Sequence, residues 1–196
     1  VHIKTATSGR DLGLGTSGGG HRVARFIHER LMCVRGRVHN VRTLVKANKK
    51  ACSLFNTGCS PQMAYGKEGY GACPSILRQW RALAAHSVGG GGGKCATTLI
   101  ACRLGQYKDP FVLAARDQAR MWYYLLGQEP DLARVCRAWY IARYKFGEEG
   151  WKSVRGPIGA TIGTLEGIGW IPKNPLRWVA RNGSHWKYTP MDLETG

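Results

Sequence analysis

Apolar residues between positions 21 and 50 recur at steps of three and four along the chain. They are Val23, Phe26, Ile27, Leu31, Val34, Val38, Val41 and Val45. This spacing places them on one side of a helix, so the sequence predicts a long amphipathic helix over residues 22–50. Gly36 lies within the pattern and costs about 1 kcal/mol relative to alanine in a helix interior, so a bend or break is expected there.

Similar periodicity continues downstream, and it is divided by proline and aspartate at helix starts and by glycine at helix ends. Asp109 and Asp131 are expected to cap the helices that follow them. The stripe predicted for the second of these helices includes Trp139, Tyr140 and Tyr144. The predicted helices cover residues 51–57 (ended by Gly58), 61–65, 74–88, 95–104, 110–126, 131–146 and 157–168.

The C-terminal part changes from helical to alternating character. Residues 178–180 and 185–188 flank Asn182-Gly183, a pair that tolerates the positive φ angles of a tight hairpin turn. The predicted fold class is therefore mainly α: a helical bundle with a long basic N-terminal helix and a small C-terminal β-hairpin. We expect a basic helical segment at 1–88, a glycine linker at 89–94, a helical subdomain at 95–147, and a C-terminal extension with the hairpin at 148–196.

Charge gives the strongest indication of a partner. The chain of 196 residues has 29 Lys and Arg against 12 Asp and Glu, a formal net charge of +17. Nucleic acid is the usual partner of such a surplus, with an anionic membrane surface as the main competitor. Within residues 22–50, nine cationic side chains face a single acidic one, Glu29. The predicted nucleic-acid-binding residues are Arg22, Arg25, Arg30, Arg35, Arg37, Arg42, Lys46, Lys49, Lys50, Arg78 and Arg81.

The cysteines and the chain start bear on the compartment. Seven cysteines, an odd number, without an N-terminal apolar signal core indicate a reducing, intracellular location, nuclear or cytoplasmic. Two C-x6-C spacings and no C-x2-C make a zinc site unfavourable, and we expect no metal, no cofactor and no membrane partner. Because the chain starts at Val1 rather than methionine, we expect it to be processed or part of a longer protein.

Two glycine-rich stretches resemble phosphate-binding loops incompletely. Residues 13–18 fit G-x-G-x-x-G but lack an acidic residue about 20 positions further on. The run 89–93 precedes Lys94 but lacks the glycine expected at position 88 and the Ser or Thr expected at 95. Linkers are the favoured interpretation of both, and a nucleotide-binding enzyme that uses a glycine loop is the least favoured function.

Catalytic chemistry and base stacking receive little support from the residues. Metal-assisted phosphoryl transfer needs carboxylates around cations, and the chain has no adjacent aspartate pair, so we expect no activity from this chain alone. The helical spacing of the aromatic residues favours core packing over stacking on bases. These are Trp80, Trp122, Tyr123, Tyr124, Trp139 and Tyr140.

Residues 50–68, KACSLFNTGCSPQMAYGKE, resemble a segment of LINE-type (non-LTR) retrotransposon reverse transcriptases. There a basic helical segment leads to a proline and a Tyr-Gly-x-Glu turn, just after the polymerase palm. Residues 10–14 resemble the Leu-Gly-Val strand that closes the palm, and residues 77–81 resemble the Leu-Arg-rich helix that follows. Residues 167–170 and the Asn-Gly hairpin resemble a pattern that some members carry further on.

The resemblance implies the thumb and C-terminal extension, which lie against the template–primer duplex and support processive synthesis. The palm with its paired aspartates would lie upstream of Val1. The expected function is therefore that of a nucleic-acid-binding, non-catalytic part of an RNA-directed DNA polymerase, with RNA, DNA or hybrid duplex and the rest of the polymerase as partners. The alternative is a stand-alone RNA-binding or ribosome-associated basic protein.

Overall fold

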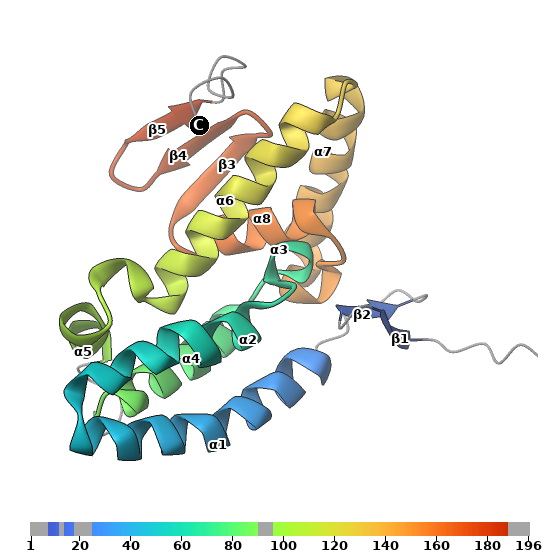
Figure 1. The fold of residues 1–196 in the computed structure, drawn as a ribbon. Coiled ribbons are helices and arrows are strands. Elements are labelled where there is room, and N and C mark those ends of the chain that lie inside the picture. Colours follow the sequence, from blue (N-terminus) through green and yellow to red (C-terminus); the bar gives the residue numbers. More distant parts are fainter. Residues whose placement is uncertain (1–7, 12–13, 18–24, 90–95, 188–196) are drawn as a thin grey trace, which may run out of the picture. The chain divides into compact units, whose positions relative to one another are not determined.

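The computed structural model describes residues 8–11, 14–17, 25–89 and 96–187 and is mainly helical, as predicted (Figure 1). The chain divides into two compact units. The first comprises Val1–Gly66 and Pro74–Leu113, and the second comprises Lys67–Cys73 and Ala114–Gly196. The boundaries expected from the sequence, at residues 89–94 and 147–148, do not coincide with this division, because α4 and α5 on either side of the glycine run pack together.

The long basic helix α1 spans Arg25–Ala47 and passes through Gly36 without a break. A side chain at Gly36 would meet no heavy atom within 4 Å, so solvent surrounds this position. The helix ends three residues earlier than predicted. Asn48 takes an extended backbone (φ −141°) and its side chain accepts a hydrogen bond from the Lys50 N–H, which competes with helix continuation.

The chain continues from α1 in a series of short turns. These are the 3-10 turn η1 (Lys49–Cys52), the π-helical turn η2 (Phe55–Cys59) and α2 (Ser60–Ala64). The prediction that Gly58 ends a helix is wrong, because Gly58 lies inside η2. Burial of the Phe55 and Cys59 side chains stabilises the helical backbone on both sides of this glycine. Helix α4 (Pro74–Ser87), which begins with a proline, and helix α5 (Ala96–Arg103), which follows the glycine run, begin close to their predicted positions.

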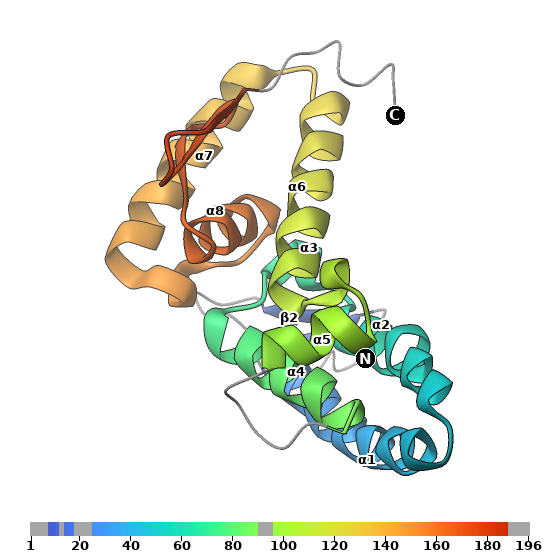
Figure 2. The ribbon, with the colours of Figure 1, turned by 90° about the vertical axis from the view of Figure 1, so that its left-hand side faces the viewer.

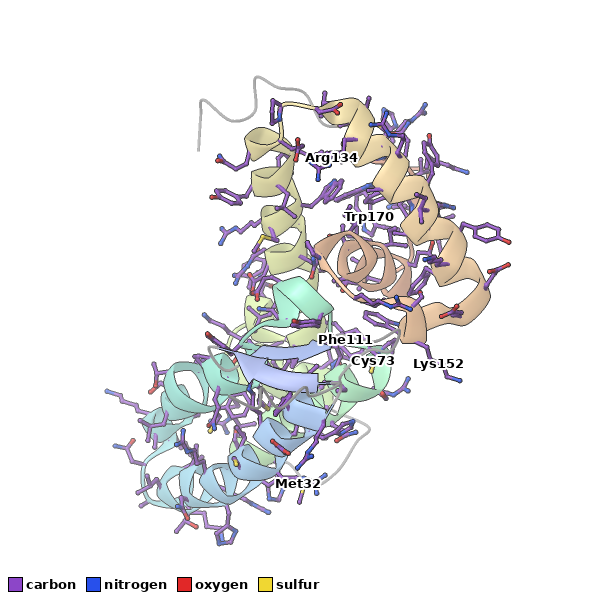
Figure 3. The ribbon with its side chains drawn as sticks, turned by 90° about the vertical axis from the view of Figure 1, so that its right-hand side faces the viewer. Met32, Cys73, Phe111, Arg134, Lys152 and Trp170 are labelled. Carbon is purple, nitrogen blue, oxygen red and sulfur yellow. The ribbon has the colours of Figure 1, made fainter. Side chains whose placement is uncertain are left out.

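The core of the first unit forms where α1 and α4 lie side by side (Figure 1). The central part of the predicted stripe, Leu31 to Val41, is buried, whereas its ends at Phe26, Ile27 and Val45 are half-buried and Val23 lies outside the described residues. Met32, labelled in Figure 3, lies on the exposed side of the same helix. The unit also contains a hairpin of β1 (Ser8–Asp11) and β2 (Leu14–Ser17) and the 3-10 turn η3 (Gln106–Lys108). The buried apolar residues of α1 and α4 are Leu31, Val34, Val38, Val41, Ile76, Leu77, Trp80, Ala84 and Ala85.

The second unit contains α3 (Lys67–Tyr70), α7 (Leu132–Glu149), η4 (Gly150–Ser153), α8 (Pro157–Gly167) and most of α6 (Pro110–Gln128). Three antiparallel strands follow in the order β3 (Trp170–Asn174), β4 (Arg177–Ala180) and β5 (His185–Lys187). The predicted hairpin is β4–β5, and Gly183 in its turn has a φ of 84°. Strand β3 was not predicted from the sequence.

A cluster of large side chains holds the second unit together, with α8 lying between α6 and α7 (Figure 2). The rings of Trp122 and Trp139 pack with centroids 4.8 Å apart. Close packing also explains Gly163 in α8, because a Cβ there would come within 2.8 Å of the Phe146 ring. The cluster consists of Trp122, Leu126, Trp139, Ile162, Leu165 and Trp178.

A buried charge anchors α3 in the second unit. Lys67 is only 7% exposed, and its Nζ lies 2.7 Å from Asp117 and 2.8 Å from Glu68. Burial by itself would raise the pKa of Asp117, but the hydrogen bonds and charges of Lys67 and Arg116 outweigh it and hold that pKa below its ordinary value. The Asp117 carboxylate therefore stays ionised and balances the buried ammonium group.

Two sequence predictions for α7 are wrong. Gly147 does not end this helix, which continues through Glu149, so Glu148 and Glu149 are helical. Tyr140 and Tyr144 do not belong to the buried stripe, since these residues are 56% and 67% exposed. Trp139 occupies the buried face, and successive helical residues are about 100° apart around the axis, so Tyr140 is turned away from the core.

Candidate nucleic-acid interface

The cations of α1 lie on two flanks of its buried stripe. On one flank they contact the segment that contains α2. The Arg37 Nη1 donates to the Gln62 Oε1 at 2.8 Å. The Arg30 guanidinium donates to the Tyr65 carbonyl and lies 5.0 Å from the centroid of that ring. Arg30 and Arg37 on this flank therefore help to attach the segment that contains α2 to α1.

The opposite flank carries a continuous row of cationic and titratable side chains. Arg35, His39, Arg42 and Lys46 follow one another at steps of four, three and four, which places them on one ridge of α1. Arg35, His39 and Lys46 are exposed, and Arg42 is half-buried. We call these four residues the cationic ridge.

The cationic ridge leads into a pocket of about 270 Å³. Four of its lining side chains are cationic and none is acidic, which gives the pocket a concentrated positive potential. Lys49 contributes because the chain turns into η1 after Asn48. The residues that line this cationic pocket are Arg42, Val45, Lys46, Lys49, Cys52, Val88, Gly89 and Arg103.

Specific contacts position the cations of the pocket. The Cys52 thiol donates to the Arg103 carbonyl at 3.3 Å, which attaches the end of α5 to η1. The Arg42 Nη1 lies 3.1 Å from Nε2 of His86 in α4. Burial lowers the pKa of His86, and the charges of Arg42 and His39 lower it further, so the imidazole is neutral at neutral pH and can accept from Arg42.

Arg103 was not among the residues predicted from the sequence. It is the last residue of α5, and its neighbours along the chain are uncharged, so no local run of charge marks it. It reaches the pocket only because α5 packs against α4 and its C-terminal end contacts η1. A basic residue in the last turn of a helix favours that end electrostatically, which is too general a signal to identify a site.

The remaining predicted residues are dispersed. Arg25 pairs with Glu29 at 2.8 Å on the exposed surface, and Arg78 is exposed on α4. Lys50 is exposed on η1 beside Lys49. Arg22 lies outside the described residues.

Arg81 has a structural role. Its Nη2 donates to Asp109 at 2.7 Å, and its guanidinium lies 4.1 Å from the centroid of the Phe111 ring. The same Asp109 oxygen accepts from the Phe111 N–H at 2.9 Å and so caps α6, as the sequence predicted. Because its guanidinium group is already in contact with Asp109 and Phe111, Arg81 is poorly placed to bind a phosphate.

Comparison with known proteins gives no relative for this chain: no protein-family model matches it, and searches of curated proteins and of solved structures found no significant match. The described residues contain no group of three or more His, Cys, Asp or Glu that could hold a metal ion. Within the same ranges, no helix has the length and apolar character needed to span a membrane.

The glycine-rich stretches lie mostly outside the described residues. Gly15 belongs to β2, whereas Gly13 and Gly18 are not described. Gly89, the first residue of the second run, is described; it has a φ of 94° and lines the cationic pocket. The described cysteines are all free thiols, namely Cys33, Cys52, Cys59, Cys73, Cys102 and Cys136.

Proposed function

We propose that this protein binds nucleic acid through the cationic ridge and the cationic pocket, which together contact the phosphate backbone. The observation that carries the proposal is a pocket lined by four cations and no carboxylate. Arg42 and Arg103 offer planar forks that suit phosphate oxygens, and Lys46 and Lys49 add point charges. Contacts of this kind fix the position of a nucleic acid without reading its base sequence.

The number of cations sets the expected salt dependence. Six side chains on and beside the ridge are available for phosphate contacts: Arg35, Arg42, Lys46, Lys49, Lys50 and Arg103. If each neutralises one phosphate of a duplex, the logarithm of the binding constant falls with the logarithm of salt concentration at a slope of about −5.

The biological setting of the proposal comes from the sequence resemblance. We propose that the chain is the thumb and C-terminal extension of a LINE-type reverse transcriptase and supports the template–primer duplex without catalysing synthesis. The coding sequence upstream of Val1 tests this setting directly. A reading frame with paired palm aspartates supports the family, and an initiation codon at that position favours a stand-alone RNA-binding protein.

The binding experiment compares two variants that lose the same charge. One carries Arg42→Gln, Lys46→Gln, Lys49→Gln and Arg103→Gln in the cationic pocket. The control replaces four exposed cations of the second unit with glutamine, namely Lys152, Arg155, Lys173 and Arg181. Fluorescence anisotropy with labelled duplex DNA and RNA–DNA hybrid is recorded over a series of salt concentrations.

We expect the pocket variant to lose at least about tenfold in affinity and to have a salt slope shallower by about three to four. The control should change the slope by less than about one, because its charges lie outside the interface. Equal losses in the two variants would mean that diffuse net charge causes binding, and the proposed interface would be rejected.

A nucleotide site is the second candidate function, and one observation favours it: the glycine run begins at Gly89 on the wall of the cationic pocket. Competition separates the two functions. Displacement of the labelled duplex by micromolar ATP, abolished by Lys94→Ala, would favour the nucleotide site. Displacement only by other polyanions supports the nucleic-acid interface.

A further inference from the structure

The outward face of α7 carries an unexpected set of aromatic and apolar side chains. Tyr140, Ile141 and Tyr144 are each more than half exposed to solvent. Tyr140 and Tyr144 are four residues apart and Arg137 precedes Tyr140 by three, so the three side chains are neighbours on one helix face. Single exposed apolar residues are ordinary, but a cluster of them marks a candidate contact surface.

Tyr140 also forms one wall of a pocket of about 370 Å³ in the second unit. The opposite wall is the turn between β3 and β4. The volume of this pocket lies within the usual range for pockets that hold a small organic group, about 300–1,000 Å³. The residues that line this tyrosine pocket are Cys136, Tyr140, Asn174, Pro175, Leu176 and Arg177.

The turn wall of the tyrosine pocket is held in place before any ligand arrives. The Asn174 Oδ1 accepts from the Leu176 N–H at 2.9 Å, which closes the turn on itself. The buried Trp122 Nε1 donates to the Pro175 carbonyl at 2.9 Å, which ties the turn to the core cluster. A preformed wall reduces the entropy lost when a ligand is ordered against it.

The charge around this surface fits an anionic partner. Arg137 and Arg177 are exposed beside the tyrosines, and Arg134 lies at the N-terminal end of α7 (Figure 3). Glu148, near the C-terminal end of α7, lies four residues after Tyr144 on the same face, so the phosphates of a partner are expected beside Arg137 and Arg177 rather than beyond Tyr144. The Tyr144 hydroxyl is hydrogen-bonded to Glu148, which raises the pKa of the phenol while the ring remains exposed.

We propose that the second unit binds a single strand of nucleic acid, with unpaired bases stacked on Tyr140 and Tyr144 and phosphates beside Arg137 and Arg177. Aromatic rings interleaved with cations are the usual means by which proteins hold single strands, because every base has a π-face. In a duplex those faces are covered by neighbouring base pairs, so this surface discriminates against duplex. The inference rests on the proposed nucleic-acid-binding function but uses a different surface from the cationic pocket.

The test measures anisotropy of a labelled 15-nucleotide oligothymidylate with the full chain. Tyr140→Ala with Tyr144→Ala should weaken binding by at least about 25-fold, because each stacked base contributes fivefold or more. Tyr140→Phe with Tyr144→Phe should stay within about twofold of the wild type, since stacking needs the ring and not the hydroxyl. Affinity for duplex DNA should be unchanged in both variants, and circular dichroism verifies that each is folded.

Two controls make the outcome specific to base stacking. Tyr124 on α6 is 61% exposed and lies outside the proposed surface, so Tyr124→Ala should leave oligothymidylate binding unchanged. An abasic strand of the same length keeps the phosphates but lacks the bases, so it should bind the wild type and the alanine pair equally.

Three results would overturn the inference: an alanine pair that binds oligothymidylate within twofold of the wild type, a comparable loss in Tyr124→Ala, or an equal loss against the abasic strand. The first result would assign this face of α7 to a protein partner. None of the three affects duplex binding by the cationic pocket, so this inference and the proposed function can fail separately.

Discussion

Asp109 is the position where a single substitution should reveal how the first unit is held together. Its side chain is 5% exposed, and one carboxylate oxygen accepts from two partners, the Phe111 N–H at the start of α6 and the Arg81 guanidinium. Asp109→Ala removes both interactions. Asp109→Asn keeps an oxygen that can cap the helix and removes the charge that faces Arg81.

The magnitude follows from these two roles. Loss of a helix cap costs about 1 kcal/mol. A hydrogen bond to a charged partner contributes about 1.5–3 kcal/mol, and the lower end applies because the Arg81 side chain is 29% exposed and partly screened by water. We therefore expect Asp109→Ala to lower the free energy of unfolding by about 2.5 kcal/mol and Asp109→Asn by about 1.5 kcal/mol.

Urea unfolding followed by far-UV circular dichroism measures both values, provided that the denaturant slope is unchanged. Asp131→Ala is the matched control, because Asp131 caps α7 through the Arg134 N–H but is exposed and lies 3.8 Å from its nearest cation, Arg137. Its loss should cost about 1 kcal/mol, the cap alone. If Asp109→Ala destabilises no more than Asp131→Ala, the structural role given to Arg81 is refuted.

Three other outcomes are expected. Asp117→Asn should lower the free energy of unfolding, measured in urea, by about 2–3 kcal/mol, because the buried Lys67 would keep only the Glu68 carboxylate as a partner. In the wild type, the stability that the Asp117 carboxylate contributes is present above the ordinary aspartate pKa and is lost as pH falls through the lowered pKa of Asp117. Because the pKa of His86 is lowered, the unfolded chain takes up the proton first, so thermal stability should fall as pH drops below about 6.5 and His86→Gln should reduce that fall. Gly163→Ala should destabilise by about 1–3 kcal/mol through its clash with aromatic rings, whereas Gly36→Ala, in open space on α1, should stabilise by about 0.5–1 kcal/mol.

Local chemistry explains the elements that sequence reasoning located correctly. Asp109 and Asp131 accept hydrogen bonds at the starts of α6 and α7, as aspartate does wherever a helix begins. Asn182-Gly183 forms a hairpin because glycine adopts positive φ at low cost. The apolar stripe of α1 is buried because its three- and four-residue spacing keeps it on one face.

Errors arose where tertiary contacts compete with local preference. Gly58 is predicted to end a helix, yet the helical backbone continues past it in η2, because the side chains of Phe55 and Cys59 are buried. The spacing places Tyr140 and Tyr144 on the predicted stripe of α7, because several apolar residues in succession leave the centre of the buried face undetermined by periodicity. Packing of Trp139 against Trp122 settles that orientation and turns the tyrosines to solvent.

By itself, the sequence determined a mainly helical chain with a strongly basic helix within residues 22–50 and a C-terminal hairpin, because periodicity, caps and net charge are local or additive properties. Only the tertiary structure decided which cations are available. It directs Arg81 to Asp109 and brings Arg103 beside Arg42, Lys46 and Lys49. The physical reason is that a site depends on the distances between groups far apart in the chain, and those distances follow from the packing of whole elements rather than from spacing within one of them.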